Sequence, residues 1–258
     1  MSIDPLYSLS GLFVGLLIGQ TGVGGGSLMT PLLILLLGVH PATAVGTDLL
    51  FAAVTKSTGT LVHGLNKTVN WQVVRMLAMG SVPATGITLF LASHIALPTA
   101  EKSALVSTVL GVALILTAIS LMFRKQVLAL AAERLEMLSV KQVRWLTVFT
   151  GAVLGVLVSL SSVGAGALGV TVLIFLYPRI PLAQIVGSDI AHAVPLTLCA
   201  GVGHWLLGSV DLSLLGSLLL GSIPGVIIGS EVAAHVPEWV LRPGLAMMLV
   251  VVGSTLVV

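Results

Sequence analysis

Charged residues are scarce in this chain, and their scarcity excludes a soluble globular protein. Asp, Glu, Lys and Arg together make up 8% of the 258 residues, where a soluble domain carries roughly a quarter. Hydrophobic residues make up 57%, and apolar runs recur from one end of the sequence to the other. We therefore predict an all-α polytopic membrane protein.

Cysteine is nearly absent as well. The single Cys199 excludes an internal disulfide and any metal site built from several cysteines. No spacing of histidine or cysteine suggests zinc, and the sequence GVGGGS lacks the Gly-Lys-Ser/Thr ending of a Walker loop. We expect no cofactor and no metal. The first ten residues lack the positive region and cleavage site of a signal peptide, so we expect none to be removed.

Glycine, in contrast, is concentrated in one place. An apolar run of about fourteen residues meets Gly22, Gly24, Gly25 and Gly26, and a second run from Ser27 to Leu37 ends at Gly38. Each run, as a helix, reaches about two-thirds of the ~30 Å hydrocarbon core. Glycines this dense are too costly for a helix interior. We predict two half-helices that meet at an unwound loop inside the membrane, where secondary transporters commonly bind substrate.

The second half of the sequence repeats the first. The first matches lie at an offset of 140 residues: Gly151 and Gly155 match Gly11 and Gly15, and residues 163–166 match 23–26. The later matches lie at an offset of 141 residues: 187–189 with 46–48, His204 with His63, 221–224 with 80–83, and His235 with His94. Polar residues that coincide in register are hard to obtain by chance. We infer an internal duplication, with a first transmembrane repeat at 1–123, an amphipathic cytoplasmic connector at 124–143 and a second transmembrane repeat at 144–258.

The charges predict how the halves are oriented. If each broken element is a re-entrant hairpin, each half adds three full spans, at 41–62, 71–92 and 104–123 in the first half, and the repeats are inverted. If each is a kinked crossing, the repeats are parallel. The stretch from Arg124 to Arg144 holds five of the eleven Lys and Arg residues, which makes the connector cytoplasmic. The inverted arrangement then places nine cations inside against one outside, and the parallel one seven against three. We predict inverted repeats with both termini outside.

The glycine loops carry the candidate substrate site. The second half-helices, starting at Ser27 and Ala167, would present free N–H groups and positive dipole ends, which suit an anion. The predicted substrate-binding residues are Gly24, Gly25, Gly26, Ser27, Lys56, Ser161, Ser162, Gly164, Ala165 and Gly166. The alternative for glycine is close helix packing, which suffices for Gly11, Gly15, Gly151 and Gly155 but not for so dense a loop. The serine hydroxyls would donate to an oxyanion or bond back along their own helix.

Lys56 lies in the middle of a predicted span. An ammonium there costs about 2.5–3.5 kcal/mol on the mildest scale, so it needs a counter-charge, a wet cavity or a neutral state. Its counterpart in the second half is Thr197, so the duplicated scaffold does not require a cation. We predict an anion ligand; the alternative is a structural ion pair with Asp48 or Asp189.

A second set of residues suits proton transfer. Asp189 and His192 are three residues apart and therefore neighbours on one helical face. A carboxylate beside an imidazole within a membrane is typical of a proton relay. The predicted coupling residues are Asp189, His192, Asp48, His63 and His204. For the aspartates the alternative is a local cap or backbone partner, and for His63 and His204 a structural place near a span end.

Several of these residues together resemble the sulfite exporter family usually called TauE/SafE. They are Gly24-Gly25-Gly26-Ser27, Pro31, Gly38, Ala44-Val45-Gly46-Thr47, His63 and Gly80-Ser81-Val82-Pro83, with their echo in the second half. The resemblance covers essentially the whole chain. It implies a multi-pass carrier in the bacterial inner (plasma) membrane for sulfite or organosulfonates, with proton coupling as a weaker implication. Ala165 and Thr171 replace a glycine and a proline of the first half, which predicts a lopsided site.

We therefore predict a secondary transporter, not an enzyme, that moves a small sulfur-containing anion by alternating access around a midplane site between the two glycine-rich breaks. The expected partners are that anion and the lipid bilayer, and no nucleic acid. The sequence does not decide whether the protein forms a homo-oligomer. One alternative is an anion channel with the glycine loops as its filter. A channel would need neither the Asp189–His192 pair nor tandem broken hairpins. A membrane-embedded enzyme or cofactor-handling subunit is the other alternative, although Ser162 has no histidine close in sequence to act as its base.

Overall fold

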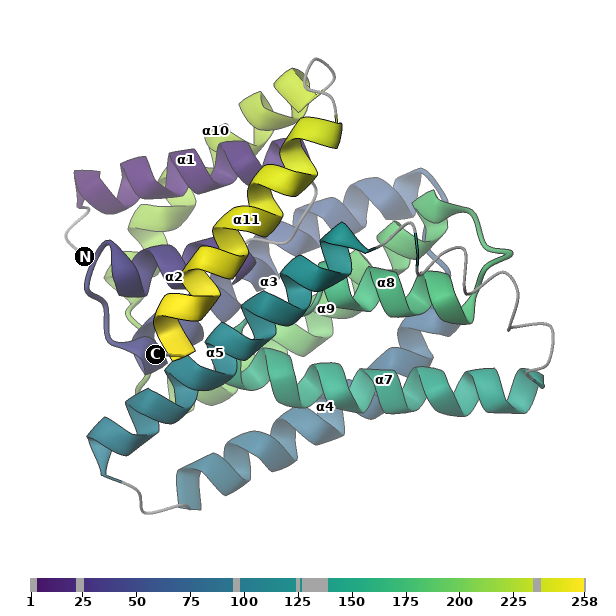
Figure 1. The fold of residues 1–258 in the computed structure, drawn as a ribbon, viewed down its shortest axis with the longest axis horizontal. Coiled ribbons are helices and arrows are strands. Elements are labelled where there is room, and N and C mark those ends of the chain that lie inside the picture. Colours follow the sequence, from purple (N-terminus) through teal and green to yellow (C-terminus); the bar gives the residue numbers. More distant parts are fainter. Residues whose placement is uncertain are drawn as a thin grey trace.

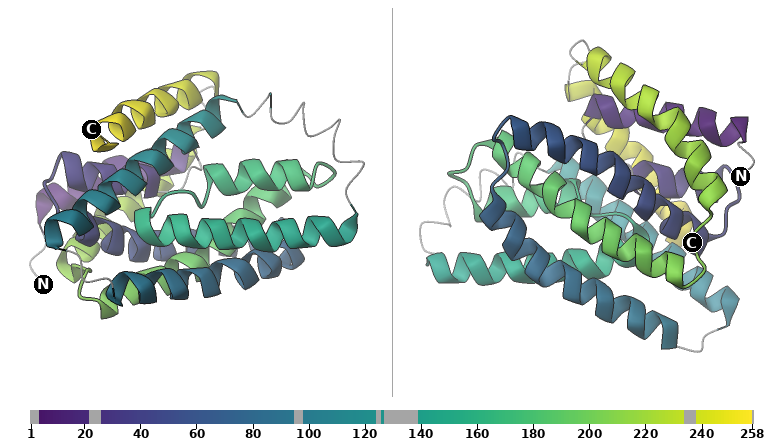
Figure 2. Two further views of the ribbon diagram at one scale, coloured as in Figure 1. Left: turned by 60° about the horizontal axis from the view of Figure 1, so that its bottom comes forward. Right: turned by 180° about the vertical axis from the view of Figure 1, so that it is seen from behind.

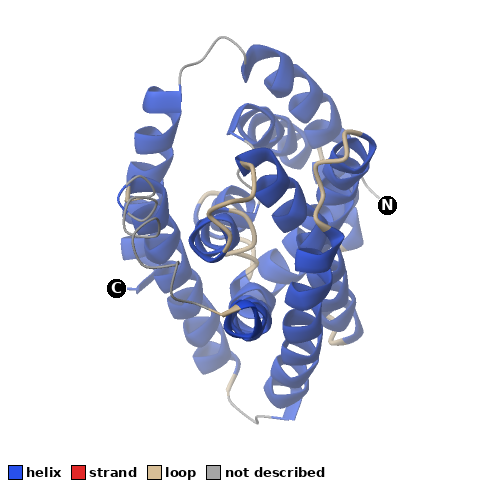
Figure 3. Ribbon diagram, turned by 90° about the vertical axis from the view of Figure 1, so that its right-hand side faces the viewer, coloured by secondary structure: helices blue, strands red, loops and turns tan. Residues whose placement is uncertain are grey.

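The computed structural model describes residues 4–21, 26–94, 98–123, 126, 139–233 and 238–257. Within these residues every regular element is a helix (Figure 3). The helices are α1 (Pro5–Thr21), α2 (Gly26–Leu35), α3 (Pro41–Leu65), α4 (Trp71–His94), α5 (Thr99–Met122), α7 (Val140–Ser161), α8 (Ala167–Leu176), α9 (Leu182–Leu206), α10 (Leu212–Ala233) and α11 (Glu238–Val257). The predicted all-α architecture is confirmed.

The outside of the molecule is apolar. Four of the described helices are long and apolar enough to cross a membrane: α4, α7, α9 and the Ser103–Met122 part of α5. Shorter apolar helices lie in α1, α8, α10 and α11. Large apolar side chains such as Phe13, Phe90 and Phe149 are each more than half exposed, as expected where lipid replaces water. The chain is a polytopic membrane protein.

Two helical hairpins correspond to the two predicted breaks. α1 and α2 run in opposite directions, and so do α7 and α8 (Figures 1 and 2). In Figure 1 α1 starts on the left and α7 on the right, so the hairpins approach the middle of the molecule from opposite ends. α8 begins at the predicted Ala167, and α2 begins at Gly26, one residue before the predicted Ser27. α11 ends on the same side as α1 begins (Figure 1).

The first helix of the second hairpin is longer than predicted. α7 has 22 residues, which at ~1.5 Å per residue would cross the whole hydrocarbon core rather than two-thirds of it. Its first turns carry Lys141 and Arg144, and the 17 residues from Trp145 to Ser161 equal the length of α1. The added length is therefore polar. It takes in 140–143 of the predicted connector, most of which lies outside the described residues, so the domain limits stay a prediction.

Glycines hold α1 against α10 and α7 against α4. A Cβ at Gly11 or Gly15 would collide with the backbone of Leu218 or Ser222 in α10, and one at Gly151 or Gly155 would collide with the backbone of Leu77 or Ser81 in α4. The two contacts are related by the repeat offset. For these four glycines the packing interpretation is confirmed, since small residues let helix backbones approach closely.

The two halves also exchange polar contacts at the ends of α3 and α9. The Thr47 hydroxyl accepts a hydrogen bond from the Asp211 N–H at 3.1 Å, and the Ser188 hydroxyl accepts one from the Asn70 N–H at 2.8 Å. Asn70 and Asp211 in turn cap α4 and α10 through their side chains. α3 and α9, which carry the two buried aspartates and the two buried histidines of the described residues, are thereby locked together at the centre of the molecule.

Candidate functional site

The loop between α7 and α8 turns sharply through residues 162–166. Ser162 adopts a left-handed conformation with φ 59°, and Gly164 and Gly166 have φ 123° and 133°, which favour glycine. The N–H groups of Gly169 and Val170 bond the carbonyls of Gly164 and Gly166 at 3.2 and 2.9 Å. The N–H groups of the first two residues of α8 have no partner within their helix. These N–H groups belong to Ala167 and Leu168, which directly follow the loop.

Lys56 reaches this loop from α3. Its ammonium donates a hydrogen bond to the Ala165 carbonyl at 2.8 Å, so a residue of the first half contacts the loop of the second. The side chain is partly buried. The ammonium interacts electrostatically with the carboxylates of Asp48 and Asp189, yet among the described residues it forms a direct ion pair with neither. The ammonium is thus bonded to a backbone carbonyl, with the two carboxylates as its nearby counter-charges.

The two aspartates lie fully buried beside the second helices of the hairpins. Asp48 Oδ2 accepts a hydrogen bond from the Thr30 hydroxyl of α2 at 2.5 Å, and its Oδ1 has no partner. Neither oxygen of Asp189 has a hydrogen-bond partner among the residues that the structure describes, and the carboxylate lies against Gly169 of α8, where a Cβ would collide with Oδ1. Three buried carboxylate oxygens are thus unsatisfied near one ammonium, a costly arrangement for a site with only structural duties.

The two serines at the end of α7 differ. The Ser161 hydroxyl donates back to the Leu157 carbonyl at 2.7 Å, which matches the alternative given for it. The Ser162 hydroxyl is buried without a hydrogen bond. It faces the Asp48 carboxylate, but the geometry between them falls short of a hydrogen bond. Of the predicted pair, Ser162 is the one with a free hydroxyl.

The histidines are bound elsewhere. His192 Nε2 lies 2.9 Å from the Ser81 hydroxyl of α4, and Asp189 has no hydrogen-bond partner, so the predicted pair is not hydrogen-bonded. His204 Nε2 donates to the Ser159 carbonyl at 2.8 Å. His63 Nδ1 lies 2.8 Å from the Thr68 hydroxyl. These contacts tie helices and turns together, which favours the structural alternative for His63 and His204.

Only the end of the first glycine loop lies within the described residues. Gly24 and Gly25 lie outside the described residues, Gly26 begins α2, and Ser27 is buried in its first turn. Sequence reasoning missed Thr30 and Ser81, which hold Asp48 and His192. The signal for Thr30 was its spacing, because it follows Ser27 by three residues and therefore shares its helical face.

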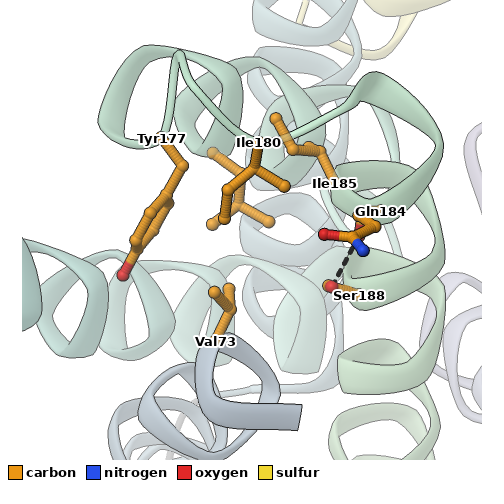
Figure 4. Close-up of a pocket in the computed structure, with 7 residues that line it drawn as sticks. Val73, Tyr177, Ile180, Gln184, Ile185 and Ser188 are labelled. Carbon is orange, nitrogen blue, oxygen red and sulfur yellow. Dashed lines mark hydrogen bonds between the residues drawn. The ribbon is translucent and has the colours of Figure 1, made fainter. Parts of the chain in front are cut away.

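A pocket lies away from this site, between α4, α8 and α9 (Figure 4). It is lined by Val73, Leu173, Tyr177, Ile180, Gln184, Ile185 and Ser188. The Ser188 hydroxyl donates to the Gln184 backbone carbonyl at 2.6 Å. No charged side chain lines the pocket, so it does not fit an anion. No cluster of three or more potential metal ligands occurs among the described residues.

The model of a family described as "Sulfite exporter TauE/SafE" matches residues 7–256. This chain belongs to the TauE/SafE family. It is 40% identical over 255 residues to the "Probable membrane transporter protein YjnA" of Bacillus subtilis (strain 168), which covers 96% of this chain and 98% of that protein. A second protein of that organism, "Probable membrane transporter protein YunE", is 38% identical over 68 residues, covering 26% and 25% of the two chains.

No solved structure matches the chain. The TauE/SafE family and both relatives are named for membrane transport rather than for catalysis. The prediction of a membrane transporter is therefore confirmed.

Proposed function

We propose that this chain is a secondary transporter that moves a small sulfur-containing anion, of the sulfite or organosulfonate class, across the bacterial inner membrane. One observation carries the proposal. The Lys56 ammonium, the free Ser162 hydroxyl and the N-terminal end of α8 meet around one glycine loop. Positive charge, a hydroxyl donor and helix N-terminal N–H groups without a partner in their own helix are what an oxyanion requires. The family name supplies the sulfur class.

We further propose that the halves are inverted repeats and that transport proceeds by alternating access around this site. The support lies in the hairpins that approach from opposite ends (Figure 1) and in the reciprocal contacts of Thr47 with Asp211 and of Ser188 with Asn70. Such inverted pairs of broken elements are the usual architecture of alternating-access carriers. The unsatisfied buried carboxylates favour an ion-coupled carrier over an anion channel.

A binding scan tests the substrate class. The purified full chain in detergent is titrated by calorimetry with sulfite, thiosulfate, methanesulfonate, sulfate and acetate. We expect a sulfur oxyanion to bind at least about tenfold more tightly than acetate, a difference of ~1.4 kcal/mol. Equal or tighter binding of acetate would refute the sulfur class.

A second measurement separates a carrier from a channel. Proteoliposomes that contain the protein are loaded with the anion that binds most tightly, and the uptake of labelled anion from outside is followed. A carrier exchanges substrate, so internal anion accelerates uptake; a channel shows no such acceleration at equal membrane potential.

A further inference from the structure

The buried charges around Lys56 do not balance. Asp48 and Asp189 supply two carboxylates, and Lys56 supplies one ammonium. If all three are ionised, the site carries a net charge of −1 before any anion enters. A bound anion adds at least one further negative charge, and such repulsion is strong in a medium of low dielectric constant.

Among the described residues, the other titratable groups on the helices of the two aspartates have partners of their own. His204 of α9 donates to the Ser159 carbonyl, and His63 of α3 contacts the Thr68 hydroxyl. α2 and α8, which pack against the aspartates, contain no titratable residue. The titratable residues of α4, α5, α7 and α10 stand near the ends of those helices. On α9, His192 interacts electrostatically with Lys56, but its Nε2 is hydrogen-bonded with the Ser81 hydroxyl. The missing positive charge must therefore come from solution.

The positive ends of the half-helices are already faced by these carboxylates. Asp189 lies against the third residue of α8, and Asp48 is bonded by Thr30, the fifth residue of α2. A carboxylate at a helix N-terminus takes up the dipole that would otherwise attract a ligand. An incoming anion thus competes with the aspartates for the same groups.

The two aspartates are not equivalent. Asp48 accepts a hydrogen bond from Thr30 and faces the Ser162 hydroxyl. Asp189 has no donor on either oxygen. An ionised carboxylate without donors bears the full cost of lost hydration, so neutralisation relieves Asp189 most. A protonated carboxyl also gains an O–H donor, which can serve the oxygen of a bound anion.

We propose that Asp189 takes up the proton that accompanies the anion, and that this neutralisation is required before the anion binds. The proton comes from solvent and bonds to the Asp189 carboxylate. His192 is then a positioning residue that holds α9 against α4 through Ser81. This inference rests on the proposed function, because it assumes that an anion binds beside Lys56.

The test uses methanesulfonate, whose charge is constant near neutral pH, whereas sulfite itself titrates there. Binding to the purified full chain is measured between about pH 5 and 9, and proton uptake is followed with an indicator dye in weak buffer. We expect the wild type to take up close to one proton per anion and to lose about tenfold in affinity per pH unit at alkaline pH. This measurement needs no variant.

Two variants then locate the proton. Asp189→Asn keeps the size of the side chain and mimics the neutral acid, so we expect it to bind the anion without proton uptake and without pH dependence. Its affinity at alkaline pH should equal or exceed that of the wild type. His192→Gln should keep both proton uptake and pH dependence. Glu101→Gln, an exposed carboxylate at the start of α5, is the matched control and should behave as the wild type.

Each contrary result has a distinct meaning. Proton uptake that persists in Asp189→Asn overturns the assignment, as does its loss in His192→Gln or in Asp48→Asn alone. Anion binding that requires sodium, is lost when choline replaces it, and occurs without proton uptake also overturns the assignment, because sodium then supplies the positive charge. A wild type that binds none of the sulfur anions refutes the proposed function itself.

Discussion

The two halves of this protein share their packing but not their chemistry. The glycine contacts of α1 with α10 recur between α7 and α4, and the Thr47 contact recurs at Ser188. Lys56, in contrast, corresponds to Thr197, whose hydroxyl bonds the Ala193 carbonyl of its own helix at 2.8 Å. The duplication supplied a scaffold for both halves, and divergence placed the ammonium in one of them.

The aspartates extend this comparison. Asp48 and Asp189 are equivalent in sequence and equally buried, yet only Asp48 has a hydrogen-bond donor. Identical residues at equivalent positions therefore have different hydrogen-bonding environments.

The largest expected effect is an all-or-none difference in sidedness between equivalent turns. Asn66 and Leu207, which both follow a long helix and are exposed, are replaced singly by cysteine in a Cys199→Ser background. With inverted repeats, an impermeant thiol reagent added outside should label Leu207→Cys, and should label Asn66→Cys only after permeabilisation. Labelling of both from the same side would show that the repeats are parallel.

The next effect concerns Lys56 and its counterpart. Lys56→Met should weaken anion binding by roughly 1.5–3 kcal/mol, the range for a hydrogen bond to a charged group. Lys56→Arg should recover only part of it, because a planar fork does not replace a point charge. Thr197→Val, at the equivalent position, should leave the affinity unchanged. Calorimetric titration checks all three variants. An unaltered affinity in a folded Lys56→Met variant would show that the lysine has a structural role and does not bind the anion.

Packing glycines provide a smaller effect that should be the same in both halves. Gly80→Ala should destabilise the protein by about 1–3 kcal/mol because the new Cβ meets the Val148 carbonyl of α7. Gly221→Ala should do the same against Ser8. On the same two helices Gly86 and Gly216 have open space, so alanine there should stabilise by about 0.5–1 kcal/mol. Thermal unfolding in detergent measures this; equal behaviour of Gly80 and Gly86 would contradict the packing account.

Sequence reasoning succeeded where a local rule decides the structure. The start of α8 at Ala167, the starts of α3 and α4 at Pro41 and Trp71, and the packing role of Gly11 and its equivalents all follow from glycine, proline and periodicity. The structure adds that the glycine contacts and the contacts of Thr47 and Ser188 recur at the repeat offset. These features depend on residues close together in the chain or on a fixed offset.

It fell short where the rotation of one helix against another decides. Asp189 and His192 are neighbours on α9, yet one side chain lies against α8 and the other meets α4. Spacing along a helix predicts proximity but not which neighbouring helix a side chain faces. The bond from Lys56 to the Ala165 carbonyl spans 109 residues, and no local pattern encodes it.

The smallest effect lies in the turns that follow α3 and α9, which have one geometry and different residues. Lys67 and Gly208 both adopt left-handed conformations, with φ 56° and 72°. Both helix ends form the same pair of backbone hydrogen bonds. After α3, the N–H groups of Lys67 and Thr68 donate to the carbonyls of Gly64 and His63. After α9, the N–H groups of Gly208 and Ser209 donate to the carbonyls of Trp205 and His204. This is the Schellman motif, in which glycine is the favoured residue because a Cβ is strained there.

Replacing the lysine therefore tests whether the first half tolerates a strained residue that the second half avoids. Lys67→Gly should stabilise the protein by about 1 kcal/mol, and Gly208→Lys should destabilise it by a similar amount. The double exchange should be close to neutral, because the two turns are far apart in the chain and share no partner. Thermal unfolding of the two single variants and the double variant checks this. A loss of stability in Lys67→Gly would mean that the lysine side chain contributes more there than its backbone strain costs.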